Sequence, residues 1–364
     1  MPKAWNLLVA PILLALAACS LGSPSPASEA KAPAIRFLWE FDADDYVRAK
    51  PLVQGDLVFF GSDDNQVRAV RMTNGDQVWA FATRDNVTST PATIDNLLLV
   101  GSWDGKVYAL DAESGKEQWS FQTAAPVGGS PVVSESVIYV GSEDGTLYAL
   151  TPSGDLVWRL PTGGRFGAGL AVVGGTIYIG STDNSLYAVQ ASDGTLAWRF
   201  TTGGDVTTTP AVSSGRVVFG SMDGTLYCLD AKTGARIWTY EAGGAITSSP
   251  LLADGVAYFG SDDGNVSAVR LNNGRILWEY NTGSIVQSQP SAWGNLLVVG
   301  NDGGTIFALD KGTGSRVWQY QTGGAITAGP AVRDNFLLVG SLDRKLYAFE
   351  MQDDGETVPE GSIP

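Results

Sequence analysis

The chain has 364 residues, 44% of them hydrophobic, and its 23 Lys and Arg against 38 Asp and Glu give a formal net charge of −15. This charge argues against nucleic-acid binding, which needs a basic face that displaces counterions from phosphates, and against binding of anionic lipid head groups. Histidine is absent, which excludes Ser-His-Asp and Cys-His catalytic systems and zinc sites built on imidazole.

Residues 1–19 have the features of a bacterial lipoprotein signal peptide. Lys3 provides a short positive region, and residues 7–18 form an apolar run that is too short for a permanent membrane span. The segment ends in Leu16-Ala17-Ala18-Cys19, which resembles the lipobox whose cysteine thiol receives a diacylglyceryl group. We therefore expect lipidation of Cys19. The alternatives are an ordinary secretory peptide, with Cys19 incidental, and an uncleaved anchor.

Residues 20–35 are rich in Ser, Pro and Ala, which is typical of a flexible tether. With Cys19 acylated, Cys228 is the one thiol left in the chain, so no intramolecular disulfide is expected. The sequence thus predicts a domain held at a membrane by its lipid alone. It would face the periplasm or, in a bacterium with a single membrane, the cell exterior.

One repeat of about forty residues accounts for the rest of the chain. A tryptophan recurs at this interval, shortened once by a residue at the turn Ser153-Gly154: Trp39, Trp79, Trp119, Trp158, Trp198, Trp238, Trp278 and Trp318. A glycine recurs in the same way: Gly61, Gly101, Gly141, Gly180, Gly220, Gly260, Gly300 and Gly340. Each of these two residue types recurs eight times at this interval, which indicates eight repeats. A period of about forty residues is typical of a propeller or a solenoid.

Each repeat contains four short strand patterns, A to D. In the fifth repeat, residues 210–214, 216–221, 225–230 and 236–241 alternate β-branched and aromatic residues between turns that contain glycine. This alternation favours antiparallel hairpins, and no segment shows sustained helical spacing. We therefore predict an all-β fold, an eight-bladed β-propeller of four-stranded antiparallel blades over residues 36–350.

The two ends of the chain complement each other. The last repeat has three strand patterns and then continues into residues 351–364, a predicted C-terminal tail without tryptophan. Residues 36–41 contain Trp39 and supply the missing pattern. We expect this N-terminal strand to complete the last blade and close the ring, which leaves only short protected edges. A linear solenoid is the alternative, but it would need polar caps that the sequence does not show.

The repeats have a characteristic internal spacing. Residues 109–119 and 308–318 fit the pattern A-x-D-x-x-x-G-x-x-x-W. This pattern resembles the pyrroloquinoline-quinone-type (PQQ-like) propeller repeat, whereas the Gly-His and Trp-Asp signatures of WD repeats are absent. Within that family, the lipidated, acidic, eight-repeat chain resembles the BamB-like outer-membrane assembly lipoproteins over residues 36–350. The resemblance implies a non-catalytic interaction scaffold at the outer membrane, facing the periplasm, with the β-barrel assembly machinery as its partner.

Two other classes of function stay open at this stage. One is a PQQ-dependent or other ligand-binding dehydrogenase-like propeller, and the other is a surface lipoprotein of a single-membrane bacterium. The quinone enzymes carry adjacent cysteines and ligands for calcium, and this sequence has no Cys-Cys pair. Asp-Gly pairs such as Asp104-Gly105 lack the ligand spacing of a calcium loop and are typical of hairpin turns. We therefore expect a monomeric protein without enzymatic activity, cofactor or metal.

The repeated tryptophans invite two interpretations. They could form an aromatic surface beneath a bound cofactor, but a single ligand cannot use eight equivalent sites. We therefore expect each tryptophan to dock its blade on the next. Cys228 replaces the alanine that precedes the turn in most repeats, and we expect it to be a small buried residue.

A binding face follows from the alternation of strand direction. The B–C turns and the D–A connections between blades emerge at one end of the ring, whereas A–B turns, such as the one with Trp293, lie at the other. We predict partner binding at the first end, where Arg, Lys and large apolar residues interrupt a small polar consensus. The candidates are Tyr46, Arg48, Lys50, Arg84, Trp103, Arg165, Phe166, Met222 and Leu342. Phe166 shares its position with Val87 and Val127, so a place in the core is its alternative.

Overall fold

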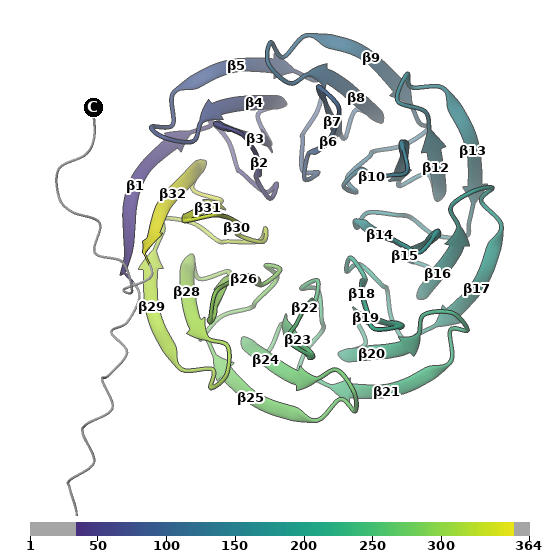
Figure 1. The fold of residues 1–364 in the computed structure, drawn as a ribbon, viewed down its shortest axis with the longest axis vertical. Coiled ribbons are helices and arrows are strands. Elements are labelled where there is room, and N and C mark those ends of the chain that lie inside the picture. The colour runs from purple at the N-terminus through teal and green to yellow at the C-terminus, as the bar shows by residue number, and fades with distance from the viewer. Residues whose placement is uncertain (1–33, 353–364) are drawn as a thin grey trace, which may run out of the picture. The chain divides into compact units, whose positions relative to one another are not determined.

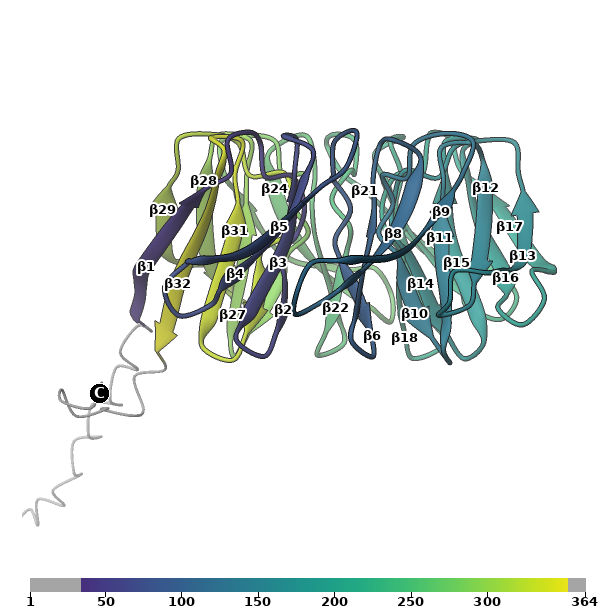
Figure 2. The same cartoon turned by 90° about the horizontal axis from the view of Figure 1, so that it is seen from above.

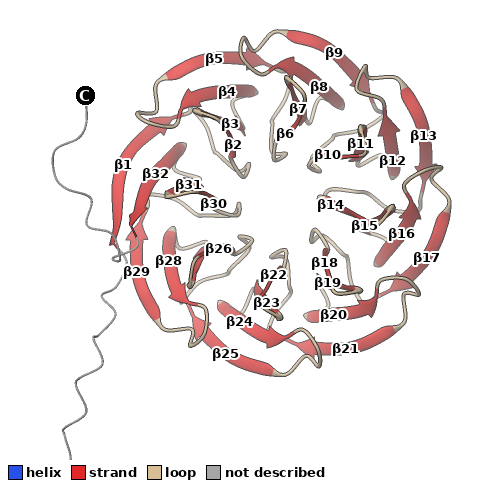
Figure 3. Ribbon diagram, in the orientation of Figure 1, coloured by secondary structure: helices blue, strands red, loops and turns tan. Residues whose placement is uncertain are grey.

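The computed structural model describes residues 34–352, and all regular structure in this range is β. The strands form eight four-stranded antiparallel sheets that are arranged as the blades of a ring (Figures 1 and 3). This arrangement confirms the predicted all-β, eight-bladed propeller. Within the described range, no helix is long and apolar enough to cross a membrane.

Blades 1 to 7 each contain four consecutive strands, A to D. Blade 1 holds β2 (Leu52–Gln54), β3 (Leu57–Ser62), β4 (Gln66–Arg71) and β5 (Gln77–Ala82). Blade 2 holds β6 (Ala92–Ile94), β7 (Leu97–Gly101), β8 (Lys106–Asp111) and β9 (Glu117–Gln122). Blade 3 holds β10 (Val132–Ser134), β11 (Val137–Gly141), β12 (Thr146–Leu150) and β13 (Leu156–Pro161). Blade 4 holds β14 (Leu170–Val173), β15 (Thr176–Ser181), β16 (Ser185–Gln190) and β17 (Leu196–Thr201).

The remaining blades follow the same order. Blade 5 holds β18 (Ala211–Ser213), β19 (Arg216–Gly220), β20 (Thr225–Asp230) and β21 (Arg236–Glu241). Blade 6 holds β22 (Leu251–Ala253), β23 (Val256–Gly260), β24 (Asn265–Arg270) and β25 (Ile276–Asn281). Blade 7 holds β26 (Ser291–Trp293), β27 (Leu296–Gly300), β28 (Thr305–Asp310) and β29 (Arg316–Gln321). Blade 8 combines β30 (Ala331–Arg333), β31 (Phe336–Gly340) and β32 (Lys345–Gln352) with the first strand, β1 (Ala34–Asp42).

Strand β1 closes the ring as its outermost strand in blade 8. It runs antiparallel to β32, with Trp39 opposite Ala348 and a bulge between Phe37 and Trp39. The N-terminal closure is thus confirmed, although the strand exceeds the predicted residues 36–41 at both ends. Strand β32 also continues past residue 350, and Met351 is fully buried, so the predicted tail begins inside a strand. Cys19, the rest of residues 1–33 and residues 353–364 lie outside the described range.

The core is a series of sandwiches between neighbouring blades. One cluster joins Phe59 and Trp79 of blade 1 to Leu98 and Tyr108 of blade 2. Another joins blade 8 to blade 1 around Trp39, and so continues the core across the closure. Because each sheet buries both faces in this way, no blade has a complete core of its own.

Tryptophan and glycine dock each blade on the next. The Trp79 indole Nε1 donates a hydrogen bond to the Ala112 carbonyl of the following blade at 3.0 Å, and its ring lies on Gly115. Trp39 makes the same bond to Met72 at 2.9 Å across the closure. Equivalent bonds link Trp119 to Pro152, Trp158 to Ala191, Trp198 to Ala231, Trp238 to Leu271 and Trp278 to Lys311. Trp318 instead packs edge-on against Phe349, with ring centroids 5.4 Å apart.

A pair of glycines in blade 5 tests this contact. Gly215 and Gly234 have nearly equal positive φ, 71° and 70°, but a Cβ on Gly234 would lie 2.7 Å from the Trp198 indole, whereas one on Gly215 meets nothing within 4 Å. Gly215→Ala should lower the free energy of unfolding by about 1 kcal/mol through backbone strain. Gly234→Ala should lose about 2 kcal/mol more, because the indole must move. Urea unfolding measures both, and equal losses would show that the indole contact contributes nothing.

Removal of residues 34–42 tests the closure. The deletion takes Trp39 out of the core and leaves β32 without its outer neighbour, so we expect stability to fall by at least about 5 kcal/mol. Thermal unfolding should show a lower and broader transition. A transition identical to that of the intact protein would mean that β1 is not needed to hold the ring together.

Candidate functional site

One end of the ring is a platform built by a repeated backbone hydrogen bond (the upper end in Figure 2). In each blade, the N–H of a B–C turn residue donates to a carbonyl of the D–A connection; Asp63 bonds Tyr46 and Trp103 bonds Asn86, both at 2.9 Å. The other pairs are Glu143 with Pro126, Thr182 with Arg165, Met222 with Asp205, Asp262 with Ala245, Asp302 with Ile285 and Leu342 with Ala325. The two segments that carry the candidate residues are therefore fixed side by side, as predicted from strand direction.

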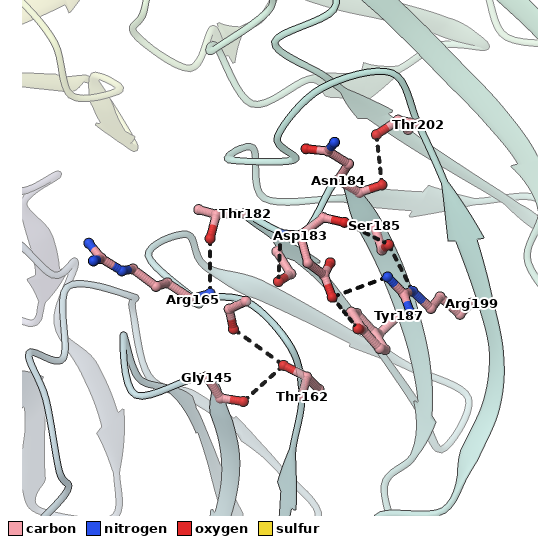
Figure 4. A network of polar contacts seen from close by, with 12 residues as sticks. Gly145, Thr162, Arg165, Thr182, Asp183, Asn184, Ser185, Tyr187, Arg199 and Thr202 are labelled. Carbon is pink, nitrogen blue, oxygen red and sulfur yellow. Dashed lines mark hydrogen bonds and ion pairs between the residues drawn. The ribbon is translucent and has the colours of Figure 1, made fainter.

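Aspartates of the B–C turns support the platform from below. In blade 4, the Tyr187 hydroxyl donates to Asp183, and Arg199 lies 3.2 Å from the same carboxylate (Figure 4). Burial, together with this hydrogen bond, raises the pKa of Tyr187 to about 12. The carboxylates also reach the connections: Asp104 accepts from the backbone N–H of Arg84 at 3.0 Å. These aspartates thus serve as anchors of the turns.

Tyr46 and Arg48 form a first ordered group on the platform. The Arg48 guanidinium donates to Asp63 at 2.6 Å and lies 4.9 Å from the centroid of the Tyr46 ring. Burial raises the pKa of Asp63, and the Arg48 charge opposes this shift. The Tyr46 side chain remains 40% exposed. An aromatic ring and a guanidinium are thus held in place with part of their surface free.

Trp103 and Arg165 belong to a second group, which spans blades 2 to 4. Trp103 is 42% exposed, and its Nε1 donates to the Thr88 hydroxyl at 2.9 Å. Its indole lies beside Gly128, and a Cβ there would also approach the Glu143 carboxylate. Glu143 in turn lies 3.8 Å from the Arg165 guanidinium. The Arg165 side chain is 71% exposed and extends away from the polar network (Figure 4).

The remaining platform candidates stand apart from these two groups. Met222 is 48% exposed and Arg84 is exposed, whereas Leu342 is partly buried. The sequence analysis missed Ile285, which is exposed on the same platform at the position that Tyr46 and Arg165 hold in their blades. A large apolar residue in a connection that otherwise has mostly small or polar residues could have pointed to it.

Two candidates do not belong to the platform surface. Phe166 is fully buried and packs on Gly141, as Val87 packs on Gly61 in blade 1, so it is a core residue and cannot contact a partner there. Lys50 points into the central channel, where its ammonium donates to the Ser291 hydroxyl of blade 7 at 3.3 Å. Both residues lie in the part of their D–A connection that runs from the platform towards strand A.

Two features that the repeat resemblance implies for the related dehydrogenases, an adjacent cysteine pair and a cluster of acidic metal ligands, are not found within residues 34–352. Cys228 is fully buried opposite Trp238, and burial raises the pKa of its thiol to about 12. Its sequence neighbours are Tyr227 and Leu229, so no cysteine pair forms. Within residues 34–352, no three acidic, cysteine or histidine side chains are grouped so that they could hold a metal ion.

Sequence comparison relates every blade of the chain to one family. The chain matches the family described as outer membrane protein assembly factor BamB over residues 30–94, 74–152, 144–285 and 281–358. No curated protein matches the chain in sequence.

Solved structures share the fold. BamB from Moraxella catarrhalis superposes with a TM-score of 0.77 and 22% identity, over 87% of this chain and 100% of that one. The computationally designed Ika8 protein gives 0.79 and 19%, over 86% and 99%. The quinohemoprotein alcohol dehydrogenase from Comamonas testosteroni gives 0.74 and 16%, over 90% and 78%. At these identities the likeness extends to the fold and no further.

Proposed function

The chain belongs to the family of the outer membrane protein assembly factor BamB, and on that premise we propose that it is a non-catalytic protein-interaction scaffold in the assembly of β-barrel proteins into the outer membrane. The observation that carries the proposal is the extent of the family match, which covers all eight blades. The absence of histidine from the sequence supports it, because it removes the commonest general base of catalysis.

The platform is the proposed contact surface, with Trp103, Arg165, Tyr46 and Arg48 at its centre. Exposed aromatic and Arg side chains supply most of the binding free energy at protein interfaces. Trp103 and Arg48 are already held by Thr88 and Asp63, so less side-chain entropy is lost when these two bind a partner. The Arg guanidinium also suits carboxylates and backbone carbonyls of a partner, because its donors form a planar fork.

The proposed anchor joins the ring at its first strand. Strand β1 begins with Ala34 at the end of the ring opposite the platform and rises towards it (Figure 2). A lipid on Cys19 would be connected to the ring through the residues that precede Ala34. The membrane would be bound through the acyl chains and the partner through the platform.

A quinone- or ligand-binding enzyme is the second candidate, favoured by the fold shared with the quinohemoprotein alcohol dehydrogenase. Stoichiometric recovery of a quinone with the purified protein, together with dye-linked alcohol oxidation, would overturn the scaffold proposal. Recovery of a barrel-assembly subunit from gently solubilised envelopes would support it.

Substitutions on the platform should weaken partner binding without unfolding the ring. Trp103→Ala and Arg165→Ala each remove an exposed anchor, and a loss of about 2 kcal/mol corresponds to roughly thirtyfold lower affinity. Surface plasmon resonance with the recovered partner measures the change. Arg275→Ala and Trp293→Ala, at the opposite end of the ring, are the matched controls. If the controls abolish binding while the platform variants retain it, the partner uses the other end.

The lipid anchor has its own test. Cys19→Ala removes the acylated thiol, so the protein should move from the membrane fraction to the soluble fraction, because several acyl chains anchor stably where one does not. Fractionation followed by immunoblotting measures the distribution. Retention of the variant in the membrane would show that something other than the lipid holds the protein there.

A further inference from the structure

The central channel contains a cavity of about 320 Å³ against the inner strands of blades 1, 6, 7 and 8. Its walls are mixed, with the apolar side chains of Leu52, Val53, Leu251 and Val332 among them. Three long polar side chains, Lys50, Gln289 and Arg333, line the same cavity. A cavity of this size and composition suits a small ligand with one polar end.

Lys50 and Gln289 are the two departures from an eightfold pattern. They occupy the same place in their repeats, just before strand A. The other blades have only Gly, Ser or Thr there: Thr90, Ser130, Gly169, Thr209, Ser249 and Gly329. The small residues link neighbouring blades, as when the Thr209 N–H donates to the Ser249 hydroxyl at 2.9 Å. Since the ring requires only small residues at this position, two long side chains that converge on one cavity point to a ligand.

The Lys50 ammonium has no acidic partner among the described residues. It donates to Ser291 Oγ at 3.3 Å, and that hydroxyl donates onward to the Pro330 carbonyl at 2.6 Å. No Asp or Glu lines the cavity, although the chain has 38 of them; Arg333 in its wall lies 3.6 Å from the Asp334 carboxylate. Burial lowers the pKa of Lys50. A partly buried ammonium with one hydrogen bond to a hydroxyl and no carboxylate beside it can pair with a negative charge brought by a ligand.

We propose that the cavity binds a carboxylate carried on a small aliphatic group. The Lys50 ammonium pairs with the carboxylate, and the Gln289 amide, which has no hydrogen-bond partner within residues 34–352, donates to its second oxygen. Leu52, Val53 and Leu251 contact the aliphatic part. A free organic acid and the C-terminal carboxylate of a polypeptide that enters the channel share this chemistry. The proposal does not depend on a role in barrel assembly.

Butyrate, with butyramide as its uncharged counterpart, is the probe for the experiment. Calorimetric or saturation-transfer titration of the purified full-length protein should show saturable binding of butyrate and none of butyramide. Lys50→Thr and Gln289→Ser restore the pattern of the other blades, so they should fold, which their melting temperatures check. Lys50→Thr should weaken butyrate binding by at least about tenfold. Lys232→Thr removes an equal charge from an exposed turn and should change nothing.

Three results would overturn the proposal: no saturable binding of butyrate, equal binding of butyramide, or unchanged affinity in a folded Lys50→Thr variant. The source of the carboxylate is decided by a further pair of probes, N-acetyl-Ala-Val and its amide. Tighter binding of the peptide acid than of butyrate supports a polypeptide end as the natural ligand. Weaker binding of the peptide acid supports a free organic acid, and binding of the peptide amide as tight as that of the acid counts against any carboxylate site.

Discussion

The rest of the structure depends on the contact between a tryptophan of one blade and a turn glycine of the next. The indole needs a carbonyl for its N–H and bare backbone for its face, and a C–D turn with a left-handed glycine such as Gly115 offers both. Trp39 makes this contact with blade 1 and so carries it across the closure. Closure of the ring is therefore a further copy of the ordinary joint between blades, made with a strand from the other end of the chain.

This repetition separates the residues that hold the ring from those that are free to differ. Tryptophan, glycine and the turn aspartates recur because each is used by the neighbouring blade. The first variable residue of each B–C turn makes the repeated platform bond through its backbone N–H, so Trp103, Glu143 and Met222 occupy equivalent places without changing the scaffold. A side chain that departs from the pattern and leaves the joint intact is under a constraint other than folding.

The fold could be predicted from the sequence because the tryptophans and glycines that recur about every forty residues make the contacts between blades. The burial of individual side chains could not be predicted in this way. Phe166 interrupts a run of small residues as conspicuously as Tyr46 does, yet it follows Arg165 by one position and points inward. Lys50 lies four residues after Tyr46, where the connection has already turned into the channel. In the other blades that position carries Gly, Ser, Thr or Gln, and their identity does not reveal the direction in which a long side chain would point.

Because β1 pairs with β32, the order in which the strands are synthesised differs from the order in which they can assemble. Arg36 meets Glu350, 314 residues away, so the first strand of the ring to leave the ribosome is the last to find its partner. Until β32 exists, β1 has an unpaired edge and Trp39 lacks half of its apolar surroundings. Closure by a strand from the other end of the chain thus leaves the first strand of the ring unpaired until the last one has been made.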